Sequence, residues 1–101
     1  PGGVRRFGEI AVDLGRCEVS KRGANIDLTA VEFKLLRVFL SNRGRVLTID
    51  ELLREVWGPD AVLTDRVVYT HVNHLRNKLE EDPRKPRHII GVRGLGYRFD
   101  D

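Results

Sequence analysis

Cysteine is nearly absent from this sequence. Cys17 is the only one in 101 residues, so no internal disulfide can form. This excludes a small secreted scaffold held by disulfides and fits a reducing compartment. Long apolar runs are also missing, since none approaches the about 18 residues that a membrane span needs. No basic-then-apolar leader opens the chain. We therefore expect a cytoplasmic protein with no membrane partner.

The motifs of common enzyme classes are missing as well. No G-x-S-x-G elbow, P-loop or H-E-x-x-H helix occurs in the chain. His71 and His74 stand three residues apart, but nothing supplies the further ligands that a zinc site requires. We therefore expect neither catalysis nor a metal or other cofactor.

The composition is that of one globular domain. An apolar fraction of 41% and a charged fraction of 33% argue against a disordered chain. We assign residues 4–101 to this domain and interpret residues 1–3 as a linker remnant or an artificial boundary. The net charge is +3, and its positive excess lies between Thr64 and Arg98. A basic face of this kind attracts polyanions at long range.

Alternation of apolar and polar residues predicts a small antiparallel sheet within residues 4–28. We expect Cys17 to be a buried residue of one strand, since free cysteine is usually buried. Ile26 and Leu28 are predicted to form its last short strand. A β-hairpin with a glycine-bearing turn is predicted over about 88–99.

Three helices are predicted between these strands. T-x-x-E patterns at Thr29 and Thr48 indicate two helix starts, because the threonine hydroxyl and the glutamate three residues later cap each other's backbone. A third helix is predicted over about 65–79, where apolar residues recur at helical spacing (Val68, Val72, Leu75 and Leu79). The predicted fold class is α+β, with an N-terminal antiparallel sheet, three helices and a C-terminal hairpin.

The outward face of the third helix carries groups that bind DNA. A helical wheel places guanidinium, hydroxyl, amide and imidazole groups there, and no acid after Asp65. The residues are Arg66, Thr70, Asn73, His74 and Asn77, with Arg76 on one flank. Guanidinium groups pair with guanine and amides with adenine, while hydroxyls and basic groups hold phosphates. The sequence thus predicts a helix that contacts DNA, since a helix that docks on protein would carry apolar anchors.

Five side chains have individual assignments. His71 borders the predicted core, where we expect a structural hydrogen bond. His74 faces outward, either to contact phosphate or simply to lie in solvent. Trp57 is expected to anchor the core or a loop. Arg98 either contacts phosphate or solvates the last strand. Arg93 stands at the hairpin turn beside two glycines, where it can enter a minor groove or hold a phosphate.

Four long motifs follow one another along the chain. They are LTAVEFKLL at 28–36, LLREVWG at 52–58, RVVYTHVNHLRNKL at 66–79 and VRGLGYRF at 92–99. With these motifs in this order, the stretch from Phe7 to Phe99 resembles the C-terminal effector domain of OmpR/PhoB-type two-component response regulators. The resemblance implies a winged helix-turn-helix whose third helix enters the major groove and whose wing meets the neighbouring minor groove.

The resemblance also implies roles for individual residues. Arg66, Asn73, His74 and Arg76 would be groove or phosphate contacts, and Arg93 the wing contact. Asn73 and His74 stand where many relatives are basic, so the base preference of relatives does not carry over directly. The family's transactivation loop, which can touch RNA polymerase, corresponds to Gly58, Pro59, Asp60, Ala61, Val62, Leu63 and Thr64.

The partners implied by the resemblance are those of a bacterial, nucleoid-associated transcription regulator. Relatives pair head to tail on direct repeats in double-stranded DNA. An N-terminal receiver domain, phosphorylated through a sensor histidine kinase, drives that pairing. The alternative is a winged helix used only for protein–protein interaction, because fold does not fix function.

Overall fold

A computed structural model describes residues 3–101 of the chain. The elements follow the order β1 (Val4–Phe7), β2 (Ile10–Asp13), β3 (Glu18–Lys21), β4 (Ala24–Ile26), α1 (Ala30–Ser41), β5 (Val46–Thr48), α2 (Ile49–Trp57), α3 (Asp65–Leu79), β6 (Ile89–Val92) and β7 (Gly96–Phe99). The predicted α+β winged helix-turn-helix is confirmed. Of the predicted linker, residues 1–2 lie outside the described part, and the Gly3 carbonyl accepts a hydrogen bond from the Leu14 N–H at 3.0 Å.

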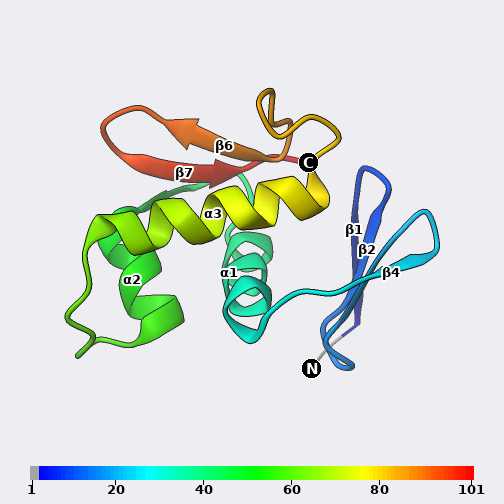
Figure 1. Ribbon diagram of the computed structural model, residues 1–101, viewed down its shortest axis with the longest axis horizontal. Coiled ribbons are helices and arrows are strands. Elements are labelled where there is room, and N and C mark those ends of the chain that lie inside the picture. Colours follow the sequence, from blue (N-terminus) through cyan, green and yellow to red (C-terminus); the bar gives the residue numbers. More distant parts are fainter. Residues whose placement is uncertain (1–2) are drawn as a thin grey trace.

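Two antiparallel sheets flank the helices (Figure 1). The first has the strand order β1-β2-β3-β4, and the second has the order β5-β7-β6. The hairpin of β6 and β7 is the wing, and it lies beside α3 (Figure 1). The strand β5 was not predicted. Its three residues are too short for a periodic signal, and it forms because Val46, Leu47 and Thr48 pair with β7.

Both predicted capping boxes are present. The Thr29 hydroxyl accepts the Glu32 N–H at 3.1 Å, and the Glu32 carboxylate accepts the Thr29 N–H at 2.9 Å. The same reciprocal pair forms at α2 between Thr48 and Glu51. These bonds satisfy backbone donors that the first turn of a helix leaves free, so they fix where α1 and α2 begin.

Two details of the predicted N-terminal sheet are wrong. Cys17 is exposed and lies in the turn between β2 and β3, not in a strand. Its backbone has φ of 55°, a left-handed geometry that closes a tight turn but cannot continue a strand. Leu28 is half-buried but lies beyond β4, which ends at Ile26, because the chain there turns into the capping box of α1.

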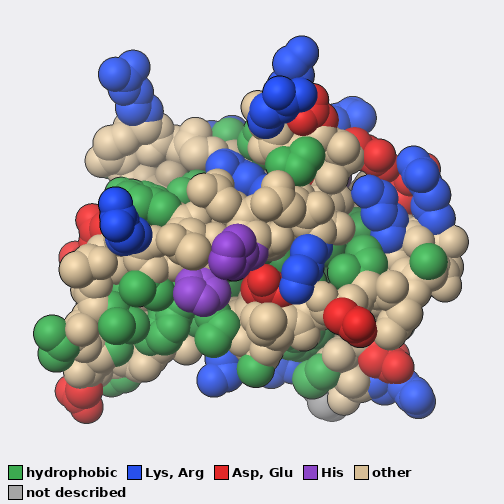
Figure 2. All heavy atoms as spheres, viewed as in Figure 1, with side chains coloured by type: hydrophobic (Ala, Val, Ile, Leu, Met, Phe, Trp, Pro, Cys, Tyr) green, Lys and Arg blue, Asp and Glu red, His purple; other side chains and the backbone are tan. Residues whose placement is uncertain are grey.

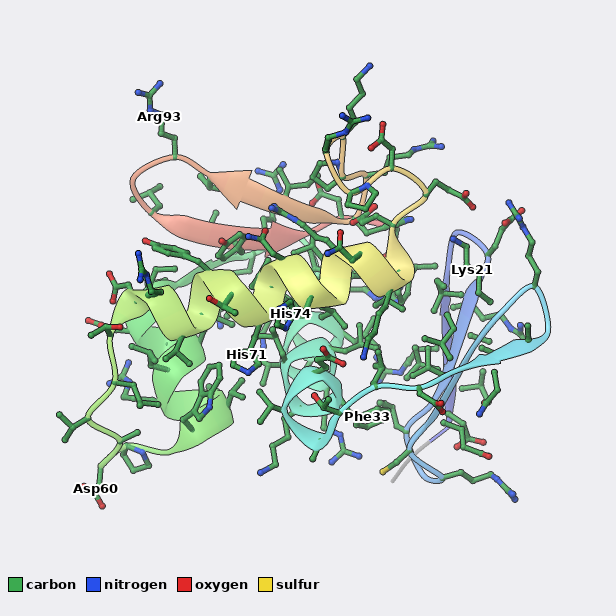
Figure 3. All side chains as sticks on the ribbon, in the orientation of Figure 1. Lys21, Phe33, Asp60, His71, His74 and Arg93 are labelled. Atoms are coloured by element: carbon green, nitrogen blue, oxygen red, sulfur yellow. The ribbon has the colours of Figure 1, made fainter. Side chains whose placement is uncertain are left out.

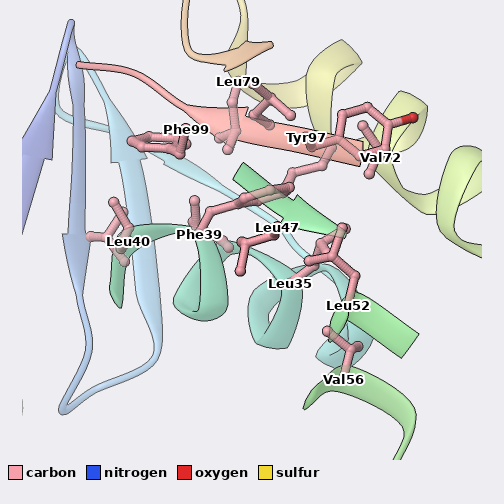
Figure 4. Packing of buried hydrophobic residues seen from close by; sticks show 14 of the residues in the cluster. Leu35, Phe39, Leu40, Leu47, Leu52, Val56, Val72, Leu79, Tyr97 and Phe99 are labelled. Carbon is pink, nitrogen blue, oxygen red and sulfur yellow. The ribbon is translucent and has the colours of Figure 1, made fainter. Parts of the chain in front are cut away.

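One hydrophobic core joins the helices to both sheets. Leu35, Leu36 and Phe39 of α1 are fully buried, and Phe39 packs against the rings of Phe99 and Tyr97 from β7 (Figure 4). The apolar stripe of α3 packs into the same core and leaves its other side to solvent. The core therefore holds α3 and the wing against one support, with their outer surfaces free.

Candidate nucleic-acid interface

The helix α3 presents the predicted polar face to solvent. Its inward stripe is buried, as predicted (Val68, Val72, Leu75 and Leu79). Its outward residues are exposed, as predicted (Arg66, Thr70, Asn73, His74 and Asn77). Figure 2 shows the histidines near the middle of this face, with one acidic and one basic side chain directly beside them. A helix with this division can approach a second molecule without disturbing the core.

His71 is fixed by the fold, whereas His74 is free to make a contact. His71 is half-buried, and its Nδ1 lies 2.8 Å from the Val67 carbonyl oxygen, which confirms the predicted structural hydrogen bond. Its ring meets the half-buried Trp57 edge to face at 5.3 Å. His74 is exposed one turn further on, with its ring centroid 6.0 Å from that of His71 (Figure 3). Trp57 thus anchors α2 against α3 at the edge of the core, which is the first of the two roles expected for it.

Arg76 lies on the flank of α3 that faces the wing. It is half-buried, and its Nε and Nη2 both donate to the Ile89 carbonyl oxygen, at 3.0 and 2.8 Å. The guanidinium also lies 5.4 Å from the ring centroid of Tyr97. The DNA contact predicted for Arg76 stays a prediction, and the structure gives the side chain an intramolecular role that the sequence did not reveal.

The wing carries Arg93 at its turn. The Arg93 side chain is exposed and projects away from the rest of the molecule (Figure 3). Gly94, with φ of 77°, takes the left-handed position of this turn, and the Leu95 N–H donates to the Val92 carbonyl at 2.9 Å. Arg93 and the polar face of α3 therefore belong to two neighbouring projections rather than to one cluster.

A groove of about 510 Å³ separates α3 from the wing. Tyr69 of α3 and Leu95 of the wing line it and are 45% and 59% exposed, so two large apolar side chains lie next to the polar face. Burial raises the pKa of Tyr97 at the floor of this groove, although the charge of Arg76 opposes the shift. Sequence reasoning left Tyr69 and Leu95 out of the site. Only their apolar character at otherwise exposed positions could have indicated them.

Arg98 is paired within the chain. Its Nε and Nη2 donate to the two carboxylate oxygens of Asp100, at 2.8 and 2.9 Å. These bonds hold the pKa of Asp100 below its ordinary value. Of the two predicted alternatives for Arg98, this geometry favours a side chain that stays on the last strand, because its Nε and Nη2 form a paired interaction with Asp100.

The segment 58–64 joins α2 to α3 at the far end of the helix pair from the N-terminal sheet (Figure 1). Gly58 caps α2 with φ of 102°, and its N–H donates to the Arg54 carbonyl. Val62 is 97% exposed and Leu63 is 42% exposed. This loop therefore exposes two apolar side chains to solvent, and neither of them lines the groove between α3 and the wing.

The described residues offer neither a metal site nor a membrane span. No group of three or more His, Cys, Asp or Glu side chains within residues 3–101 is arranged to hold a metal ion. None of the helices in that stretch combines the length and the apolar character that crossing a bilayer demands.

Comparison with known proteins places the chain among transcription regulators. Residues 23–99 match the family described as "Transcriptional regulatory protein, C terminal". The KDP operon transcriptional regulatory protein KdpE of Escherichia coli is 43% identical over 99 residues, which are 98% of this chain and 44% of that protein. The sensory transduction protein RegX3 of Mycolicibacterium smegmatis is 44% identical over 97% of this chain and 43% of its own length. The chain thus spans less than half the length of these relatives.

Solved structures give the same picture. The response regulator DrrB of Thermotoga maritima, described as an OmpR/PhoB homologue, superposes with a TM-score of 0.91 at 33% identity, over 98% of this chain and 45% of that one. The DNA-binding domain of Klebsiella pneumoniae RstA, solved in complex with the RstA box, superposes with a TM-score of 0.85 at 29% identity, over 96% of each chain.

Proposed function

The chain belongs to the family of C-terminal domains of transcriptional regulatory proteins, and from that premise we propose that it binds double-stranded DNA sequence-specifically as the output domain of an OmpR/PhoB-type response regulator. The observation that carries the proposal is the exposed polar face of α3 beside an exposed arginine on the wing. In this arrangement α3 enters the major groove and the wing meets the adjacent minor groove.

The groups on α3 match the chemistry of base edges and phosphates. Arg66 can donate two hydrogen bonds to guanine, and the amide of Asn73 or Asn77 can both donate to and accept from adenine. Thr70 and His74 carry groups that bind phosphate oxygens. A major groove about 12 Å wide accepts an α-helix, so an exposed helical ridge can reach these edges.

On the wing, Arg93 is assigned to the neighbouring minor groove or to its phosphates. A guanidinium suits both, because the minor groove offers acceptors and a strongly negative potential. The RstA domain, which superposes over nearly the whole of both chains, was solved on its DNA box and supports the assignment. No apolar ridge on α3 itself favours a protein partner in its place.

The rest of the proposal concerns a longer protein, because the matched relatives are more than twice as long as this chain. We assign to it a receiver domain ahead of residue 1, phosphorylated through a sensor histidine kinase, and a cytoplasmic, nucleoid-associated location. Head-to-tail pairing on direct repeats and contact of the 58–64 loop with RNA polymerase belong to the same proposal. The exposed Val62 and Leu63 support a protein contact at that loop.

Selection of bound duplexes from a random pool tests the proposed function. We expect one enriched sequence, and we expect the affinity for it to fall steeply with salt, by about 0.9 in the log–log slope per phosphate neutralised. Recovery of random sequences only, or of none, would overturn sequence-specific binding.

Replacement of Asn73 by Ala then tests whether α3 reads bases. We expect a loss of about 1–3 kcal/mol on the selected duplex and a much smaller loss on random DNA, because only the selected duplex offers the matching base. Asn25→Ala, at another exposed asparagine, in β4, is the matched control and should change neither affinity. An equal loss on both duplexes would show that Asn73 holds phosphate and reads no base.

A further inference from the structure

The first residue of the wing is Ile89. Both its backbone N–H and its carbonyl oxygen are hydrogen-bonded to side chains, those of Glu80, directly after α3, and Arg76, within α3. Its N–H donates to the Glu80 carboxylate at 2.8 Å, and its carbonyl oxygen accepts two bonds from Arg76. From this geometry we propose that Arg76 and Glu80 are positioning residues, which fix the wing relative to α3 so that the two reach adjacent grooves together. The inference rests on the proposed DNA binding.

Glu80 receives the chain where it enters the wing. Its side chain is only 4% exposed and follows directly after α3. Its Oε1 accepts the Arg87 N–H at 2.8 Å, and its Oε2 accepts the His88 N–H at 3.0 Å as well as that of Ile89. A buried carboxylate with three backbone donors is strongly held, because leaving any of these groups unpaired in the interior costs free energy.

Arg76 holds the wing from the other side of Ile89. It stands one helical turn before Glu80, so both side chains lie along the same edge of α3. Its guanidinium bonds to β6 through the Ile89 carbonyl and lies over the Tyr97 ring in β7. Because Ile89 belongs to β6 and Tyr97 to β7, this one side chain contacts both wing strands.

The consequence for binding follows from the length of the wing. Arg93 lies four residues beyond Ile89, which at about 3.3 Å per strand residue is about 13 Å. A small rotation at Ile89 therefore moves the Arg93 guanidinium much further than it moves the base of the hairpin. Binding sites require their groups to be held within about 0.5 Å of the working geometry. A clamp at the base sets this position before DNA arrives.

The neighbouring Glu81 offers a matched control. It is exposed, and its carboxylate pairs with Lys21 of β3 at 3.5 Å and with Arg22, in the turn after β3, at 3.0 Å. Glu81→Gln removes the same charge as Glu80→Gln from the adjacent position, but it leaves the contacts to the wing in place. Both variants therefore gain the same DNA affinity from the loss of one negative charge, and any difference between them comes from the contacts to the wing.

Amide hydrogen exchange tests the clamp without DNA. In Glu80→Gln we expect the Leu95 amide at the wing turn to exchange about tenfold faster, while the amides of Val72 and Leu75 inside α3 keep their rates. Glu81→Gln should change neither. Unchanged exchange at the wing turn in Glu80→Gln would overturn the proposal. If no duplex binds the wild-type chain, the proposed function fails, and this measurement still decides the clamp.

Affinity for the selected duplex tests whether the clamp acts through the wing. We expect Glu80→Gln to bind about tenfold more weakly than Glu81→Gln, and we expect this factor to disappear when both also carry Arg93→Ala. An identical factor in both backgrounds would show that Glu80 does not act through the wing contact. Thermal unfolding identifies a misfolded variant. If Glu80→Gln misfolds, Arg76→Lys replaces it, because this variant keeps the charge but loses the paired donation to Ile89. Its effect on affinity is then measured with and without Arg93→Ala.

Discussion

Lys78 of α3 and Glu32 of α1 form an ion pair, with Nζ 2.6 Å from Oε1. Glu32 is only 3% exposed, and the same carboxylate oxygen accepts the Thr29 N–H. Lys78 also donates to the Asp27 carbonyl at 2.9 Å. The polar helix is thus fixed to the first turn of α1 by a side chain from its own last turn.

Removal of Lys78 should destabilise the fold. Lys78→Met leaves the Glu32 carboxylate buried with only its capping bonds, and we expect a loss of about 1–2 kcal/mol in the free energy of unfolding. This figure is reduced because the Lys78 side chain is 35% exposed and partly screened by water. Lys85→Met, a change at an exposed loop lysine, is the control for chemical denaturation and should have no effect. Equal stability of the two variants would contradict a structural role for the pair.

Acid should weaken the fold through Glu32. Burial alone would raise the pKa of Glu32, but hydrogen bonds from Lys78 and Thr29 and the Lys78 charge together hold it below the ordinary value of 4.5. A carboxylate whose folded pKa is depressed stabilises the fold fully above its unfolded pKa, and this stabilisation is lost as the pH falls through the folded pKa.

The pH dependence can be measured by urea unfolding between pH 7 and pH 3. We expect the free energy of unfolding of the wild-type chain to fall as the pH drops below about 4.5, with a shallower fall in Glu32→Gln, because that variant has no proton to bind at this site. Parallel curves for the two chains would show that Glu32 titrates normally in the fold.

The wing should not tolerate a side chain at Gly96. A Cβ there would overlap the Leu47 carbonyl oxygen and lie 3.0 Å from the Thr48 Cα, both backbone atoms of β5. We expect Gly96→Ala to cost at least about 2 kcal/mol, because backbone cannot move aside as a side chain can. Gly94→Ala meets no atom within 4 Å and should cost about 1 kcal/mol, from its left-handed φ alone. Equal melting temperatures for the two variants would be inconsistent with the β5–β7 contact.

The exposed loop should be separable from DNA binding. Val62 is 97% exposed and touches no part of the core, so Val62→Ser should leave both the melting temperature and the affinity for the selected duplex unchanged. In the full-length regulator, on a promoter that it activates, the same change should lower transcription if the loop contacts polymerase. Loss of DNA affinity with the fold intact would show that the loop belongs to the DNA interface.

The helices could be predicted from the sequence because their signals are local. The capping threonines and glutamates lie three residues apart, and the stripe of α3 repeats within fifteen residues. The exposure of Asn73 and His74 follows from that periodicity alone. The family resemblance then supplied the arrangement of the wing, which periodicity does not contain.

The remaining features depend on residues far apart in the chain. Arg76 and Lys78 stand on the helix surface by their spacing, but Ile89 and Glu32 engage them only once the tertiary structure has formed. Glu80 directly follows α3, and its three backbone partners lie seven to nine residues further along the chain, at Arg87, His88 and Ile89. Cys17 was misplaced because a two-residue alternation continues across a turn as easily as along a strand.

The pairing of β5 with β7 means that the core is completed late during synthesis of the chain. The two strands are about fifty residues apart, and β7 follows all three helices along the chain. The helices therefore leave the ribosome before the strand that closes their core, with Phe39 and Leu47 still uncovered. Such long-range contacts slow folding, because the loop between them must be ordered first. A nascent chain stopped before Tyr97 would hold all three helices but lack Tyr97 and Phe99, the two rings against which Phe39 packs.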